Sequence, residues 1–348
     1  MSVPTCARCQ RTLPDDYRLC PYDGTPLEEG VAAAPAPALF AGRYEILRML
    51  GEGGMARVYK ALDPRTGKHV AIKVIEGPAA RTATWAERLL REVELLRSIR
   101  HPNVVTVTDG GRRDDGSPYL VMEYLEGETL GQLMRRNVVL PVEAALAIVT
   151  EIAAGLAASH AVGIIHRDIK PDNIFLIEDA GQVLRAKVFD FGFARLQGGA
   201  GLTAKGFIVG TPEYMAPEQT VNDPTGQRTD IYGLGVVMYR MITGVLPFQG
   251  DPGVLLAKHL FVRPKVPSEV REGVPRDVEA VVMSALRKLP RNRYPSMQDF
   301  LEDLERLTGK RPGKITADLV AWDDVYEPHS AFAKAIAEKL AKKVAPHA

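Results

Sequence analysis

Short apolar runs separated by glycine or polar turns open the main part of the chain and predict a small β-sheet. Residues 44–50 form one run, residues 57–62 a second, and residues 70–73 (VAIK) lie in a third. Residues 85–99 then change to helical spacing. The apolar positions of this predicted helix are Leu89, Val93, Leu96 and Ile99.

Further along, apolar runs predict a strand over residues 185–189 and a helix over residues 297–307. After a break at residues 308–313, the tail repeats Phe332, Ile336 and Leu340 at every fourth position. The lysines near them are Lys334, Lys339, Lys342 and Lys343. This amphipathic basic helix has two open interpretations. It binds an acidic membrane surface or a partner, or it packs on its own domain or frays in solution.

Residues 166–173 (HRDIKPDN) place a carboxylate, an ammonium and an amide on one short loop. Asp168 can accept a proton from a hydroxyl nucleophile, Lys170 can neutralise a transferred phosphate, and Asn173 can hold a metal ion. Phosphoryl transfer depends mainly on positioning and charge neutralisation. This loop therefore indicates a phosphoryl-transfer site.

Residues 51–58 (GEGGMARV) form a glycine-rich turn between two predicted strands. Gly51, Gly53 and Gly54 let the backbone approach phosphates, because glycine has no Cβ and a free φ. On its own this turn is a weak signal, since an ordinary hairpin has the same pattern. Lys73 in the third apolar run is costly to bury unless it is paired.

Two more motifs complete the series. Asp190-Phe191-Gly192 follows a predicted strand, where the carboxylate can bind Mg²⁺, and residues 210–218 read GTPEYMAPE. In this order, over about 265 residues, the motifs resemble those of bacterial eukaryotic-like (Hanks-type) Ser/Thr protein kinases. One departure is Ala56, where the family has its third glycine. The resemblance implies an α+β, two-lobed fold: a small antiparallel sheet with one helix, then a mainly helical lobe from near Thr129.

The resemblance implies ATP and Mg²⁺ (or Mn²⁺) as cofactors, with Asn173 and Asp190 as metal ligands. Lys73 would hold the α- and β-phosphates, and Glu92, nine residues before His101, would orient it. The alternative is a solvated Glu92, with Glu94 two residues away.

The same register implies an adenine pocket. Met122 would narrow access behind the base, and Glu126 or Glu128 would bond the ribose. The hinge would be Glu123, Tyr124 and Leu125, and the apolar roof Leu50, Val58 and Ala71.

For catalysis, the resemblance implies Asp168 as the base and Lys170 as the charge stabiliser. Thr211 would bond both, and residues 210–218 would receive a peptide, so the acceptor would be a Ser or Thr of a protein. Glu218 would form a buried ion pair with Arg293. Asp230 would hold the backbone of the catalytic loop.

Two arginines near the site suggest regulation. Arg167 and Arg195 could together grip a phosphate on the loop between them, and Thr203 is the best acceptor. Autophosphorylation would then order this loop. The alternative is an unmodified Thr203 in a loop that is ordered without phosphate.

All three cysteines lie in the first 20 residues. Cys6, Cys9 and Cys20, with Asp23 where a fourth cysteine would stand, resemble a small zinc ribbon with a possible Zn²⁺ site. So short a segment folds only with metal. A decayed site, a redox-active pair or a disordered leader are the alternatives, whereas a structural disulfide is disfavoured.

Composition agrees with one soluble kinase domain. A net charge of +1 suggests no nucleic-acid face. No uninterrupted apolar stretch reaches the roughly 18 residues that a spanning helix needs, and no secretory signal is visible, so a cytoplasmic protein without a membrane span is expected. We expect a zinc-ribbon-like segment (1–28), an Ala/Pro linker (29–42), the kinase domain (43–308) and a tail (309–348). Its partners would be protein substrates and itself. The rival interpretations are a pseudokinase scaffold and a small-molecule kinase.

Overall fold

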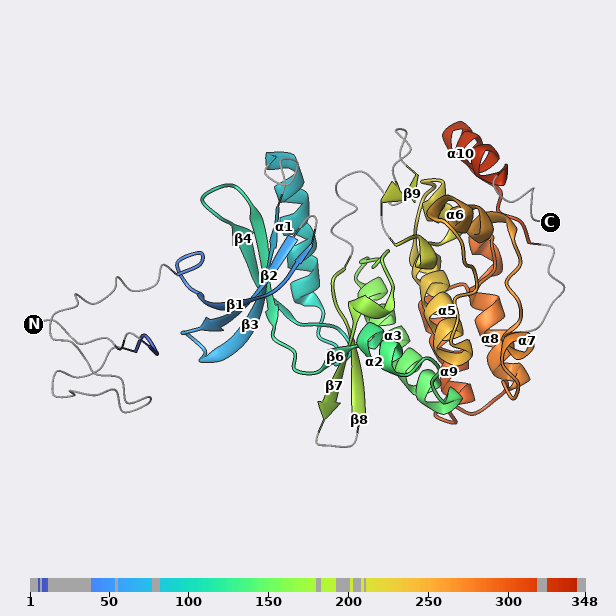
Figure 1. The fold of residues 1–348 in the computed structure, drawn as a ribbon, viewed down its shortest axis with the longest axis horizontal. Helices are drawn as coiled ribbons and strands as arrows, with labels where there is room; N and C mark the ends of the chain where they lie inside the picture. The colour runs from blue at the N-terminus through green and yellow to red at the C-terminus, as the bar shows by residue number, and fades with distance from the viewer. Residues whose placement is uncertain are drawn as a thin grey trace, which may run out of the picture.

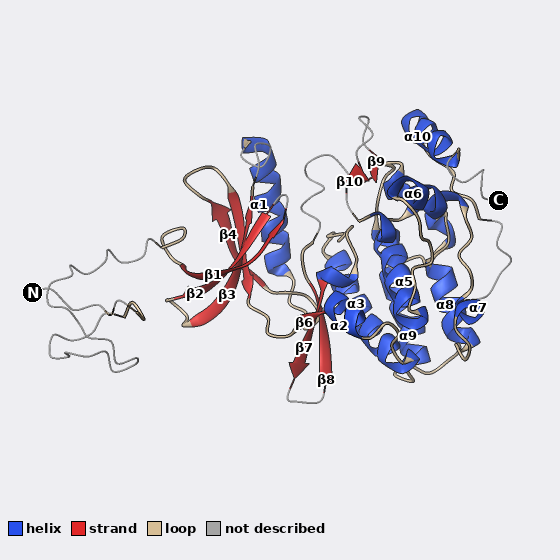
Figure 2. Cartoon of the chain, in the orientation of Figure 1, coloured by secondary structure: helices blue, strands red, loops and turns tan. Residues whose placement is uncertain are grey.

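A computed structural model of the chain describes residues 6, 8–11, 39–53, 56–76, 82–179, 183–191, 201–202, 208–209, 211–317 and 324–342. These residues form two lobes side by side, the first built mainly on a sheet and the second mainly on helices (Figures 1 and 2). The expected two-lobed α+β architecture is confirmed.

The first lobe is a five-stranded antiparallel sheet in the order β1-β2-β3-β5-β4. Its strands are β1 (Glu45–Gly53), β2 (Ala56–Asp63), β3 (Lys68–Ile75), β4 (Val107–Arg112) and β5 (Pro118–Glu123). The first three match the predicted apolar runs. The predicted helix is α1 (Ala83–Ser98), which packs on β4 and β5.

Helix α1 buries the apolar face that its periodicity predicts. Leu89, Val93 and Leu96 are each at most 3% exposed. The helix comes so close to β4 that a Cβ on Gly110 would lie 2.7 Å from Cγ1 of Val93. Glycine at this position therefore allows α1, which carries Glu92, to approach the sheet.

The second lobe contains most of the helices. They are α2 (Leu130–Arg136), α3 (Val142–Ala161), α4 (Pro217–Thr220), α5 (Gln227–Thr243), α6 (Pro252–Phe261), α7 (Pro267–Val270), α8 (Arg276–Ala285), α9 (Met297–Leu307) and α10 (Ala331–Ala341). Buried α5, with α3 and α9 against it, forms the centre of the lobe.

Two small sheets and short 3₁₀ turns complete the described structure. A three-stranded sheet has the order β6 (Glu128–Thr129), β7 (Ile174–Asp179), β8 (Val183–Val188). The small pair β9 (Gly201–Leu202) and β10 (Ile208–Val209) follows it. The 3₁₀ turns are η1 (Pro171–Asn173), η3 (Pro212–Tyr214) and η4 (Pro290–Asn292).

Helix α3 is, among the described residues, the one helix long and apolar enough to cross a membrane. Of its most apolar window, 61% is buried inside the protein, where the helix contacts α9, β8 and α5. The length and apolar composition of α3 are therefore explained by its position in the core.

The tail helix α10 packs on its own protein, which was the second of the two interpretations of its pattern. Ile336 and Leu340 are buried against α6, beside Leu256 and Leu260. Figure 1 shows α10 beside α6 at the end of the second lobe. The lysines at 334, 339 and 342 are exposed, and Lys343 lies outside the described residues.

Candidate active site

Asp230 on α5 fixes the backbone of the loop of residues 166–173. The buried carboxylate of Asp230 accepts the backbone N–H groups of His166 (2.8 Å) and Arg167 (2.6 Å) and contacts Nε2 of His160 (2.8 Å). Burial alone would raise the pKa of Asp230, but these hydrogen bonds lower it below its usual value. The expected anchoring of the loop by Asp230 is thus seen in the structure.

The predicted catalytic groups converge on one point. Nζ of Lys170 lies 2.9 Å from Oδ2 of Asp168 and donates to Oγ1 of Thr211 at 3.1 Å. Nδ2 of Asn173 donates to both the backbone oxygen and Oδ2 of Asp168, at 2.8 and 2.9 Å. These contacts leave Oδ1 of Asn173 free of Asp168. Thr211 bonds Lys170 as expected, but the described structure shows no hydrogen bond between Thr211 and Asp168, which was also expected.

Lys73 on β3 pairs with Asp190, not with Glu92 as the sequence suggested. The ammonium of Lys73 contacts Oδ1 of Asp190, and Glu92 does not join it in the described structure. Asp190 has a left-handed backbone, with φ of 65°, at the point where the chain leaves β8. The side chain of Lys73 is 14% exposed, so a charged partner offsets part of the cost of removing its ammonium from water, and here that partner is Asp190.

Glu92 lies instead within electrostatic reach of Arg167. Partial burial raises the pKa of Glu92, and the Arg167 guanidinium opposes that shift. Nε of Arg167 is buried without a hydrogen-bond acceptor among the described residues. Arg167 also has φ of 66°, so its backbone is held in an uncommon conformation. Arg195 and Thr203 lie outside the described residues.

The ring of His166 connects the catalytic loop to the residues that follow β8. Its Nε2 donates to the Phe189 carbonyl at 2.9 Å, and the ring lies 4.7 Å from that of Phe191, which is buried. The side chain of Phe191 thus packs on the catalytic loop, while its neighbour Asp190 faces Lys73. Gly192 lies outside the described residues.

A cavity of about 550 Å³ lies between the lobes and ends at Lys73 and Asp190. The other expected wall residues that line it are Leu50, Val58, Ala71, Met122, Glu123, Tyr124 and Leu125. Glu126 also lines it, whereas Glu128 pairs with Arg136. Gly51 and Gly53 lie in the β1–β2 hairpin but not in the wall, and Gly54 is outside the described residues.

The sequence did not indicate several wall residues. They are Arg48, Val105, Gly127, Thr129, Gln132, Phe175 and Phe189. Thr129 and Gln132 form a capping box that begins α2 at the edge of the cavity. The pattern Thr-x-x-Gln is a readable helix start, but only the fold brings that helix end to the cavity.

Glu123 connects the cavity to the strand that leads to Asp190. Its Oε1 accepts Nζ of Lys187 on β8 at 2.6 Å and the Thr106 backbone N–H at 2.7 Å. A partly buried ion pair therefore links Glu123, at the end of β5, to Lys187 on β8.

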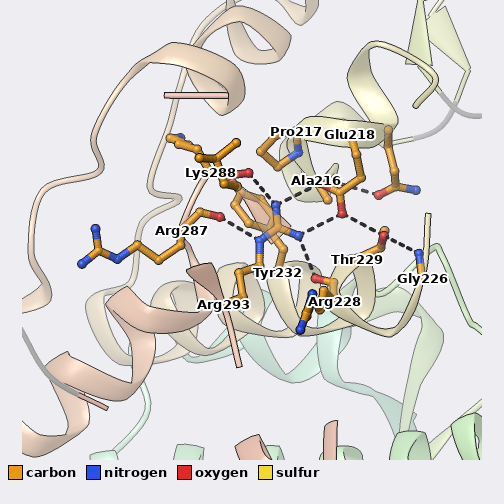
Figure 3. A network of polar contacts seen from close by, with 12 residues as sticks. Ala216, Pro217, Glu218, Gly226, Arg228, Thr229, Tyr232, Arg287, Lys288 and Arg293 are labelled. Carbon is orange, nitrogen blue, oxygen red and sulfur yellow. Dashed lines mark hydrogen bonds and ion pairs between the residues drawn. The ribbon is translucent and has the colours of Figure 1, made fainter. Parts of the chain in front are cut away.

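The segment after Thr211 is fixed by the expected Glu218–Arg293 ion pair (Figure 3). The two terminal nitrogens of the Arg293 guanidinium donate to the Glu218 carboxylate at 2.9 Å, and the Thr229 hydroxyl donates to the same carboxylate at 2.8 Å. Next to it, the Gln219 side chain donates to the Arg167 carbonyl at 2.8 Å. Helix α4 thus ties residues 211–218 to the catalytic loop.

At the N-terminus, residues 6 and 8–11 make a tight turn around the first two cysteines. The Cys9 N–H approaches Sγ of Cys6 at 3.5 Å, and the Gln10 N–H donates to the Cys6 carbonyl at 2.8 Å. Gln10 has φ of 55°. Neither cysteine is in a disulfide. Cys20 and Asp23 lie outside the described residues, and the described ones contain no group of three metal-binding side chains.

Comparison with known proteins agrees with this geometry. The family model for the protein kinase domain matches residues 44–304. Serine/threonine-protein kinase PknB of Mycobacterium leprae is 37% identical over 281 residues, 79% of this chain and 44% of that protein. Serine/threonine-protein kinase PksC of Streptomyces coelicolor is 39% identical over 278 residues, 78% of this chain and 50% of that protein.

Solved structures show the same relationship. The crystal structure of the PknI kinase domain of Mycobacterium tuberculosis superposes with a TM-score of 0.61 at 29% identity, covering 78% of this chain and 99% of that chain. The chain spans at most half the length of the curated relatives named above. From the family match and the arrangement of Lys73, Asp168, Asn173 and Asp190, this chain belongs to the protein kinase family.

Proposed function

We propose that this protein is a serine/threonine kinase that moves the γ-phosphoryl group of ATP to hydroxyls of protein substrates. The observation that carries the proposal is the Asp168–Lys170–Thr211 group. In this group the ammonium of Lys170 lies 2.9 Å from the proposed base, Asp168, and donates at 3.1 Å to Thr211, which begins the proposed peptide-receiving segment (residues 211–218). The kinase names of the relatives support the same reaction.

Each side chain has a defined task in this reaction. Asp168 accepts the proton of the substrate hydroxyl, and Lys170 beside it offsets negative charge on the transferred group. Lys73 holds the nucleotide phosphates at the end of the cavity. The cavity walls orient the adenine, so that the γ-phosphate points toward Asp168.

The donor set also suits Mg²⁺ or Mn²⁺. Asp190 offers carboxylate oxygens at the cavity, and Asn173 turns Nδ2 to Asp168, which leaves its Oδ1 for a metal. Bound there, the metal would neutralise phosphate charge.

The test compares the wild type with Asp168→Asn in the presence of γ-labelled ATP and Mg²⁺. We expect label on myelin basic protein or on the kinase itself, and a loss of about 10²–10⁴-fold in the variant at unchanged nucleotide affinity. Asp277→Asn, which changes an exposed carboxylate on α8, is the matched control and should keep full activity. Nucleotide binding without label on any protein would support the pseudokinase scaffold instead.

Regulation by autophosphorylation at Thr203 is a second part of the proposal. It is supported by the buried Nε of Arg167, which has no acceptor among the described residues. Phosphopeptide mapping after incubation with ATP should place phosphate on Thr203, and Thr203→Ala should lower activity. Asp168→Asn protein serves as the unphosphorylated control. Phosphate elsewhere, with a fully active Thr203→Ala, would refute this part.

We also propose a structural zinc ion at the N-terminus, bound by Cys6, Cys9, Cys20 and Asp23. The turn at residues 6–11 supports it, because an N–H directed at a cysteine sulfur stabilises a thiolate. Elemental analysis of the reduced full chain should find one zinc per molecule and much less in Cys6→Ser/Cys9→Ser. Equal zinc content in both proteins would contradict the site.

The proposed location is the cytoplasm. The observation in favour is that the most apolar helix, α3, is a core element that packs on α5 and α9. Cell fractionation of the tagged full chain tests this, and recovery in the membrane fraction after a high-salt wash would contradict it.

A further inference from the structure

The part of the tail after residue 323 contacts the second lobe through two buried carboxylates. One belongs to the tail and the other to the second lobe. Asp324 of the tail is 3% exposed, and it accepts the backbone N–H groups of Lys288 and Leu289 and Nδ2 of Asn292. These groups lie on the turn just before Arg293, the partner of Glu218. The tail thus stabilises one side of the Glu218 ion pair.

The second carboxylate, Asp223, lies three residues after the end of α4 and is 2% exposed. The hydrogen bonds that its side chain makes in the described structure all come from the tail. They are the Tyr326 hydroxyl (2.8 Å), the His329 N–H (2.9 Å) and Nδ1 of His329 (3.2 Å). The Asp223 N–H in turn donates to the Glu218 carbonyl at 2.8 Å. Tyr326 is therefore two hydrogen bonds away from the peptide-receiving segment.

An apolar cluster closes the joint. Ala333, Ile336, Ala337 and Leu340 of α10 pack with Leu256 and Leu260 of α6 and also with Met215 and Val221. Met215 lies four residues after Thr211, which bonds Lys170. The apolar side of α10 therefore belongs to the same cluster as Met215, in the segment that begins at Thr211.

We propose that residues 324–342 act as a fixed strap on the peptide-receiving segment, with Tyr326 as a positioning residue for protein substrates. Two buried carboxylates and a buried apolar cluster are features of a permanent contact, not of a detachable lid. The strap acts through Asp223 and Met215 on residues 211–218. It should therefore set the affinity for the protein substrate and leave the nucleotide site unchanged.

The inference rests on the proposed kinase function, so its test includes one measurement without turnover. Tyr326→Phe keeps the ring and removes only the hydroxyl that bonds Asp223. We expect the KM for myelin basic protein to rise about tenfold at unchanged KM for ATP, because a hydrogen bond to a charged group is lost. Amide hydrogen exchange of residues 211–223 should be faster in the variant.

Tyr294→Phe is the matched control. Its hydroxyl also bonds a buried carboxylate, Asp303, but that carboxylate binds the beginning of the tail at Thr316 and Ala317. This variant should lose stability without a change in KM or in exchange at residues 211–223. A Tyr326→Phe enzyme that matches Tyr294→Phe in KM and exchange would overturn the proposal.

Ile336→Asp tests the helix itself, with exposed Lys339→Ala on the same helix as its control. A strap predicts a higher KM for the protein substrate and faster exchange in Ile336→Asp only. Increased activity of Ile336→Asp would mean that α10 is an inhibitory cover, and would also overturn the proposal. If the protein has no kinase activity but amide exchange of residues 211–223 is still faster in Tyr326→Phe and Ile336→Asp and not in their controls, the strap is supported and only the proposed function is contradicted.

Discussion

Arg293 and Glu218 form a bidentate ion pair in which neither side chain is more than 2% exposed. The remaining guanidinium donors are also satisfied: Nε donates to the Arg287 carbonyl, and the two terminal nitrogens donate to the carbonyls of Arg228 and Lys288 (Figure 3). Breaking such a pair leaves a buried charge without a partner. The pair therefore links residues 211–218 to α5 and to the turn before η4.

Arg293→Met should destabilise the protein by about 3–5 kcal/mol, because Glu218 would stay buried and unpaired. The urea midpoint of unfolding is the measurement. Arg311→Met removes one of the two arginines that pair with Glu302, in a more exposed ion pair, and should cost less than about 1 kcal/mol. Similar losses in both variants would contradict the role of the buried pair.

Asp230→Asn should lower kcat by about 10²-fold, because the amide cannot accept all the N–H groups that now fix His166 and Arg167. Binding of ATP should change little, since the cavity walls lie elsewhere. Steady-state kinetics with nucleotide titration separates the two effects. Loss of nucleotide affinity in parallel with kcat would show that Asp230 supports more than the loop.

Gly155→Ala on α3 should destabilise the protein by about 1–3 kcal/mol despite the better helix propensity of alanine. The added Cβ would lie 2.5 Å from the Asn103 carbonyl oxygen, which accepts the Val188 N–H two residues before Asp190. Gly226→Ala, where a Cβ meets nothing within 4 Å, is the control. Thermal unfolding of both variants tests the prediction, and equal midpoints would contradict it.

Lys288→Met should change how stability depends on pH. Burial, together with the nearby Arg293 charge, holds the pKa of Lys288 well below its usual value of 10.5. Between this lowered pKa and 10.5 the unfolded chain binds the proton that the folded protein lacks, so in that range this lysine makes stability rise with pH, by at most about 1.4 kcal/mol per unit. Between pH 7 and 9, Lys288→Met should show a smaller rise than the wild type.

Lys339→Met changes an exposed lysine on α10 and is the control for that experiment. Its stability should follow the wild type at both pH values. Chemical denaturation at pH 7 and pH 9 gives the four differences needed. If Lys288→Met and the wild type differ equally at both values, the lysine is charged in the folded protein.

Much of the site could be read from the sequence because its residues act in short local motifs. Asp168, Lys170 and Asn173 lie within six residues, and the bonds between them depend on one loop conformation. The apolar periods predicted the first strands of the first lobe and helices such as α9, and the resemblance of the motifs to those of protein kinases implied the two-lobed fold.

Contacts between distant segments were harder to predict. The sequence offered Glu92 as the partner of Lys73, yet Asp190, 117 residues away, takes that place because the fold brings the residues after β8 next to β3. Thr129 and Gln132 were missed for a similar reason. Their pattern predicts only a helix start, and the packing of α2 against β7 and η1 decides that this start borders the cavity.

The sequence by itself determined the chemistry of the loop, the order of the motifs and the amphipathic period of the tail. It left the occupant of the tail's apolar face open, because the same period suits a membrane, a partner or the protein's own surface. Only the tertiary structure decided this. It places Leu256 and Leu260 of α6 next to Met215 and Val221, so that α10 buries its apolar face on them and Asp223 receives its hydrogen bonds from Tyr326 and His329.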